Sequence, residues 1–142
     1  MSSQGSSLVP PDYVTPAFPS FSWDLGNLKK TDPKNLLYYR GDIILFTTLW
    51  TIIWFAILFG LGGVWGYLVF RKNKLGILLL IGQLGAGVGL GAASGAVVGA
   101  VLGGLYNAGQ FGMPTWIPCG WGMVQALVVI VSAYAEVSLN TL

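Results

Sequence analysis

The chain has 142 residues, of which only 8% are charged and 54% are hydrophobic. An average soluble domain carries about 25% charged residues, so this chain has too little polar surface to cover a soluble fold. The totals therefore indicate an integral membrane protein of one domain. A net charge of +2 does not indicate nucleic-acid binding, and the sole cysteine, Cys119, excludes a disulfide within the chain.

Residues 1–41 form a segment rich in proline and serine, distinct from the apolar residues 42–142 that follow. It lacks the basic, apolar and cleavage regions of a secretory signal. Its composition predicts a disordered tail. The alternative is an aromatic patch that docks on a partner or on the lipid surface, formed by Phe18, Phe21 and Trp23.

The first predicted span runs from about Ile43 to Phe70, a stretch of 28 residues without charge. A helix needs about 20 residues to cross a bilayer, so this one must tilt or extend beyond the hydrocarbon. The basic turn Arg71-Lys72-Asn73-Lys74 ends it. Such a short turn leaves room only for an antiparallel neighbour.

The second span, from about Leu75 to Tyr106, contains a glycine every fourth residue, at Gly87, Gly91, Gly95, Gly99 and Gly103. In water, each glycine would cost a helix roughly 1 kcal/mol relative to alanine. In hydrocarbon the backbone has no water to bond, so the helix forms regardless, and small residues let helices approach closely. The pattern predicts a glycine-packed central helix.

On a helical wheel the small residues of this span cover about half of the circumference, because Ala92, Ala96 and Ala100 extend the glycine stripe. One neighbouring helix needs an arc nearer 100°. Three interpretations follow: the glycines pack the three helices internally, they contact a transmembrane helix of a second protein, or they form a shallow groove for a lipid acyl chain.

A loop over Asn107 to Pro118 leads to the third span, from about Cys119 to Leu139, which Trp116 and Trp121 enter as an aromatic belt. The predicted fold is thus all-α, a bundle of three transmembrane helices with its termini on opposite sides. The compact basic turn favours a cytosolic position, which places the tail in the lumen and the C-terminus in the cytosol.

Nothing in the sequence resembles a catalytic constellation, so no catalytic residue, metal or cofactor is expected, although bound phospholipid is compatible with the apolar faces. Glu136 is the only acid within a span. Because three spans bring it to the side of the basic turn, an interfacial ion pair is expected with Arg71, Lys72 and Lys74. The alternative is a proton or cation site.

Two amides lie inside apolar runs, Gln83 and Gln125. Such groups serve as interhelical hydrogen-bonding glue, with a ligand contact as the alternative. Gln83 projects away from the small half of its helix, which predicts that it faces headgroups or a partner.

From Leu49 to Leu142 the chain resembles the transmembrane protein 170 family of small three-span proteins. The resemblance rests on short matches in a fixed order: Leu49-Trp50, Arg71 to Gly76, Gly104 to Gly109, Met113-Pro114, Gly122, Gln125, Val128-Val129 and Ser132.

This resemblance implies a non-enzymatic protein of the endoplasmic reticulum and nuclear envelope with a luminal N-terminus. Family members are associated with membrane shaping and with large bridge-like lipid-transfer proteins. The expected function is a membrane scaffold or adaptor, with membrane lipids and a larger membrane-associated protein as partners, and a homo-oligomer as a further option. The alternative function is a small transporter or channel subunit.

Overall fold

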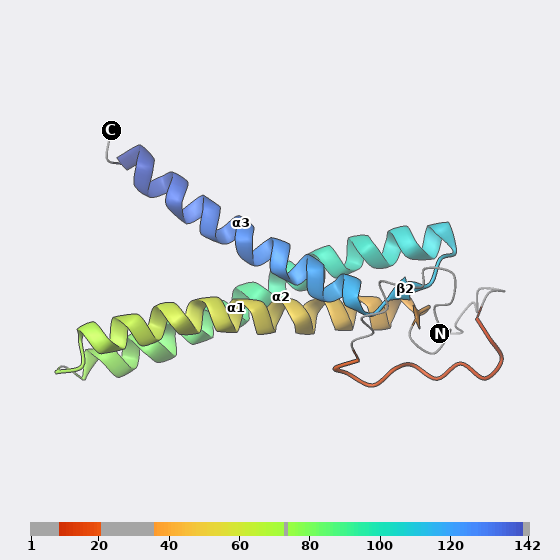
Figure 1. The fold of residues 1–142 in the computed structure, drawn as a ribbon, viewed down its shortest axis with the longest axis horizontal. Coiled ribbons are helices and arrows are strands. Elements are labelled where there is room, and N and C mark those ends of the chain that lie inside the picture. Colours follow the sequence, from red (N-terminus) through yellow and green to blue (C-terminus); the bar gives the residue numbers. More distant parts are fainter. Residues whose placement is uncertain (1–8, 21–35, 73, 141–142) are drawn as a thin grey trace.

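The computed structural model describes residues 9–20, 36–72 and 74–140, and within this part of the chain three helices are long and apolar enough to cross a membrane. They are α1 (Arg40–Val69), α2 (Leu75–Gly109) and α3 (Trp116–Asn140). Two short strands, β1 (Leu36–Leu37) and β2 (Met113–Pro114), pair antiparallel just before α1 and just before α3. Figure 1 shows this order of elements. The all-α fold class predicted from the sequence is confirmed.

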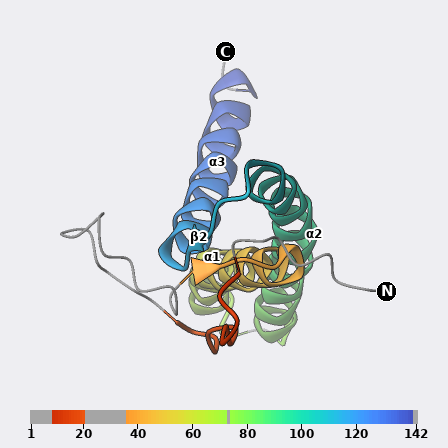
Figure 2. The ribbon, with the colours of Figure 1, turned by 90° about the vertical axis from the view of Figure 1, so that its right-hand side faces the viewer.

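α1 and α2 form a long antiparallel hairpin that ends at the basic turn, whereas α3 packs on α1 and has few contacts with α2. α3 touches α1 through its N-terminal half and then diverges, so that its C-terminal end stands apart from the hairpin (Figure 1 and Figure 2). We call the end that holds the start of α1 and the end of α2 the tail-side end, and the opposite one the turn-side end.

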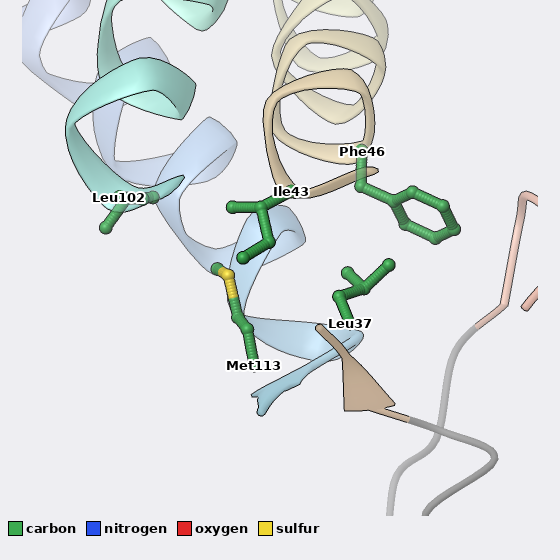
Figure 3. Packing of buried hydrophobic residues seen from close by; sticks show 5 residues of the cluster. All are labelled: Leu37, Ile43, Phe46, Leu102 and Met113. Carbon is green, nitrogen blue, oxygen red and sulfur yellow. The ribbon is translucent and has the colours of Figure 1, made fainter. Parts of the chain in front are cut away.

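The buried apolar core lies at the tail-side end, where the two strands close the bundle. It consists of Leu37, Ile43, Phe46, Leu102 and Met113. Figure 3 shows Leu37, Ile43 and Met113 pointing toward one another from β1, α1 and β2. These three side chains are at most 1% exposed, while most of the remaining lateral surface of the helices is bare aliphatic side chain, as expected of a protein solvated by lipid.

Residues 9–20, which we call the docked segment, follow an irregular course along α1. The Tyr13 hydroxyl donates to the Leu36 carbonyl oxygen over 2.7 Å, and the Thr15 hydroxyl donates to Asp42 Oδ2 over 2.9 Å. The expectation of a disordered tail therefore does not hold for this segment. Long-range hydrogen bonds of this kind leave no mark on the local composition from which disorder was predicted.

Phe18 belongs to the docked segment and packs edge-on against its own chain, with ring centroids 5.4 Å from Phe46 and 5.6 Å from Trp50. The predicted aromatic patch would have placed this ring on a partner or on lipid. The other two members of that patch, Phe21 and Trp23, lie outside the described residues.

The helix ends differ from the expected bounds by a few residues. α1 begins at Arg40, which brings Asp42 into its first turn, where a carboxylate is favoured by the helix dipole. α2 continues to Gly109 and stops because Gln110 adopts a left-handed conformation (φ 55°), with Phe111 N–H donating to the Tyr106 carbonyl over 3.2 Å. This is a Schellman cap. α3 starts at Trp116, so the expected loop shortens to six residues, 110–115.

Candidate functional site

The five glycines that recur every four residues in α2, which we call the glycine seam, all face α1 and are all buried. A Cβ atom at Gly95 would lie 2.8 Å from Thr48 Cα, and one at Gly91 would lie 3.0 Å from Ile52 Cα. A contact to a backbone atom cannot be relieved by moving a side chain, so a side chain at Gly95 would force the helix backbones to shift, and one at Gly91 would require α1 to give way slightly. The structure places the seam in the internal interface.

The residues of α1 that meet the seam also recur every four positions. Gly103 meets Arg40, Gly99 meets Ile44, Gly95 meets Thr48 and Gly91 meets Ile52, with Gly87 meeting Phe55 and Phe59. Two ridges of equal spacing thus interdigitate along the antiparallel pair, and the backbones approach as small-xxx-small motifs allow. This register fixes which levels of the two helices are opposite one another.

The other small residues of α2 lie largely outside this interface. Ala92 and Ala100 are half-buried, Ala96 is exposed, and a Cβ added at Gly89 would meet nothing within 4 Å. The side of α2 farthest from α1 is fully exposed. We call it the outer face of α2, and it comprises Gly82, Ala86, Gly89, Ala93, Val97 and Val101.

The helical wheel predicted that Gln83 faces headgroups or a partner, and the structure shows that this prediction is wrong. Its Cβ lies 3.4 Å from the Cβ position of Gly63, and its Nε2 lies 3.8 Å from that of Gly62, so it packs against α1. The reason is that a four-residue ridge drifts by about 40° per step, so the interface turns around α2. Gln83 stands four residues before Gly87, and continuing the period by one step would have found it.

Gln125 lies where α3 crosses α1. Its Nε2 donates to the Thr51 hydroxyl oxygen over 3.1 Å, and the Thr51 hydroxyl itself donates to the Thr47 carbonyl over 2.8 Å. Gly122 permits the approach, because a Cβ there would lie 3.1 Å from the Trp50 carbonyl carbon and from Thr51 N. Thr51 is 0% exposed, so this neutral hydrogen bond lies between the helices. Sequence reasoning missed Thr51 and Gly122, although a glycine three residues before the amide marks the contact.

The structure does not bring Glu136 to the basic turn. Glu136, Arg71, Lys72 and Lys74 are all exposed, and no ion pair joins them within the described part of the chain. The C-terminal turns of α3 lead away from the hairpin, on the side opposite the docked segment (Figure 1).

Because α3 diverges, two apolar grooves open beside it. One, of about 250 Å³, separates α1 from α3, and we call it the α1–α3 groove; its lining residues are Trp54, Ile57, Leu58, Leu61, Met123, Ala126, Leu127 and Ile130. The other, of about 430 Å³, lies between the tail-side ends of α2 and α3 and includes Tyr106, Trp116 and Trp121. Beyond the first groove, residues 131–139 of α3 are all exposed.

Metal-binding chemistry is not offered by the described residues, among which no group of three or more histidine, cysteine, aspartate or glutamate side chains converges. Cys119 is half-buried near the start of α3. What the site can do is make apolar contacts in a membrane, either with acyl chains or with other helices.

A glycine-packed hairpin, a third helix attached at one end and three apolar spans define a small multi-pass membrane protein of the all-helical class. Residues 36–142 match the family described as Transmembrane protein 170A/B-like, and the chain belongs to that family. The match begins at β1, somewhat earlier than the resemblance seen in the sequence, and covers every helix.

One relative is the "Uncharacterized protein YPR153W" of Saccharomyces cerevisiae (strain ATCC 204508 / S288c). It is 34% identical to this chain over 129 residues, which cover 91% of each of the two proteins. No solved structure matches this chain.

Proposed function

We propose that this protein is a non-enzymatic scaffold or adaptor in the membrane of the endoplasmic reticulum or nuclear envelope. It shapes the membrane or holds a larger lipid-handling partner. In this proposal the N-terminus is luminal, and the C-terminus and the basic turn are cytosolic, as family resemblance and the compact charge of Arg71, Lys72 and Lys74 favour.

The observation that carries the proposal is the third helix. Its N-terminal half is fixed to α1 by Gly122 and Gln125, yet residues 131–136 are all exposed. An exposed apolar helical surface beside an apolar groove suits either a partner's transmembrane helix or an acyl chain. The glycine seam, in contrast, is already occupied by α1 and serves to make the hairpin rigid.

The chemistry of the surface favours this class over a transporter or channel subunit. A solute pathway brings polar groups to the middle of the membrane. Here the polar contact at the helix crossing is a neutral hydrogen bond between Gln125 and Thr51, and the α1–α3 groove is lined by apolar side chains. Catalysis needs convergent titratable groups, and after residue 41 the carboxylates of the sequence are Asp42 and Glu136.

The test is purification of the tagged full chain from its native membrane in a mild detergent, followed by analysis of co-purifying protein and phospholipid. We expect a stable larger complex that contains phospholipid. Leu127→Trp fills the α1–α3 groove and should release the partner and the lipid, whereas Val128→Trp, one residue further on and outside the groove, should retain them. A closed ring of identical copies that conducts ions would overturn the proposal.

A further inference from the structure

The docked segment places irregular backbone against α1 at a defined depth. Phe18 contacts Phe46 and Trp50, which lie about two and three turns into α1, and the neighbouring Val14 is 79% exposed. Lipid offers no hydrogen-bond partner to an exposed coil, so such backbone does not occur in the hydrocarbon. This face of α1 must therefore lie in the headgroup layer or in water as far as Trp50.

The docked segment and α2 lie on opposite faces of α1. Its contacts with α1 fall at Asp42, Phe46 and Trp50, whereas the glycine seam meets Ile44, Thr48 and Ile52. These two sets each repeat every four residues and are offset by two, which is about 200° around a helix. The order across the tail-side end is thus docked segment, α1, α2 and finally the outer face of α2.

The outer face of α2 is bare at this same end. Val97 is 65% exposed and Val101 is 58% exposed, and α2 has no charged residue from Leu75 to Gly109. The register puts Val101 between Gly99, which meets Ile44, and Gly103, which meets Arg40. Val101 is therefore nearer to the tail-side end than Phe46 or Trp50. If the hairpin stood upright, a hydrocarbon boundary low enough to exclude Phe18 would exclude Val101 as well. The apolar Val101 side chain would then lie in water.

Helix length points to a tilt that resolves this conflict. The apolar run from Ile43 to Phe70 is about 42 Å long at 1.5 Å per residue, against a hydrocarbon thickness of about 30 Å. A tilt of about 40°, at the upper end of what transmembrane helices show, brings the apolar run to about 32 Å along the membrane normal. In both views the docked segment and the C-terminal end of α3 lie on opposite sides of α1 (Figure 1 and Figure 2). If the membrane normal runs between the directions of the hairpin and of α3, the hairpin is tilted. The docked segment then lies toward the membrane surface, and the tail-side end of α2 lies toward the middle of the bilayer.

We propose that the α1–α2 hairpin crosses the bilayer obliquely, with the docked segment in the headgroup layer and the outer face of α2, including Val97 and Val101, against lipid acyl chains. The surface that this outer face fits is the hydrocarbon of the bilayer. This inference depends on the chain being a membrane protein and not on its being an adaptor, so the two can fail separately.

The experiment uses single-cysteine variants of the full chain in a Cys119→Ser background, reconstituted in phosphatidylcholine vesicles. A membrane-impermeant maleimide is supplied to both sides by freeze–thaw. Ala17→Cys in the docked segment should be labelled, and Val101→Cys and Val97→Cys should react on the order of tenfold or more slowly, because an apolar surrounding suppresses the thiolate. Leu90→Cys, deeper in α2, is the protected control, and denaturing detergent should equalise all four.

Labelling at both Ala17→Cys and Val101→Cys would show an upright hairpin that projects into water, and would overturn the proposal. Protection at both would place the docked segment inside the membrane and overturn it equally. A fluorophore on Val101→Cys should be quenched by lipids with brominated acyl chains. Protection without such quenching would mean that a second copy of the chain covers the outer face, which also contradicts the proposal.

Discussion

The Cβ position of Gly95 lies 2.8 Å from the Cα atom of Thr48, closer than side-chain Cβ atoms approach another backbone. At this point of α2 the neighbouring helix occupies the space of a methyl group. Added Cβ atoms along the rest of the seam would likewise lie 2.7–3.0 Å from atoms of α1, so alanine there would press on the neighbouring helix.

Gly95→Ala should therefore destabilise the folded protein by about 1–3 kcal/mol, the usual cost of overpacking a close contact. Thermal unfolding of the purified protein in detergent measures this. Gly89→Ala is the matched control, since its Cβ would meet nothing within 4 Å on the exposed face of the same helix. Equal stability of the two variants would show that α1 and α2 are not in the register described.

Gln125→Leu should weaken the attachment of α3, because it removes the hydrogen bond to Thr51. Hydrogen bonds between membrane helices contribute about 0.6 kcal/mol on average and at most about 2 kcal/mol. A double-mutant cycle with Thr51→Val should give a coupling energy in that range. Val128→Ala, at a side chain that is 59% exposed, should leave stability unchanged. An additive cycle would contradict the contact.

Alkaline pH should release the docked segment. Burial raises the pKa of the Tyr13 hydroxyl above its ordinary value of 10.0, and the charge of Asp42 raises it further. Because the neutral form is favoured in the docked state, this contribution to docking is complete below about pH 10 and is lost as pH rises through the raised pKa.

A spin label on Ala17→Cys should accordingly stay immobile up to about pH 10 and gain mobility above it. Tyr13→Phe lacks the ionisable hydroxyl and its hydrogen bond to the Leu36 carbonyl. In this variant the mobility of the spin label should be higher at neutral pH and should not increase further above about pH 10. An identical alkaline transition in both proteins would assign it to another group.

Glu136→Gln should change the free energy of unfolding by less than about 0.5 kcal/mol, as is usual for an exposed side chain without a partner. The structure leaves Glu136 exposed and away from the basic turn, whereas the sequence predicted an ion pair there. Unfolding of Glu136→Gln alongside Arg71→Gln tests this. A matching loss of stability in the two variants would favour the predicted ion pair over the arrangement described.

The spans were predictable because apolar runs of this length rarely form anything other than a transmembrane helix. The four-residue glycine period is also visible in the sequence, but the residues of α1 that meet it are not. A helical wheel treats the helix as straight and its neighbour as fixed at one angle, so it placed Gln83 outside an interface that in fact drifts around α2 to reach it. The spacing of Gly122 and Gln125 marks a close contact of α3 but does not identify Trp50 as its partner, and the docking of Phe18 leaves no mark on the local pattern.

The attachment of α3 at one end alone gives the molecule two unequal cross-sections. At the tail-side end the three helices are gathered around one core, while at the turn-side end the tip of α3 stands apart from the hairpin (Figure 1). The outline spanned by the three helices is thus wider in the leaflet next to the basic turn than in the other. In the orientation proposed above, that is the cytosolic leaflet. Copies gathered in one patch of membrane should then bend it with the cytosolic side convex.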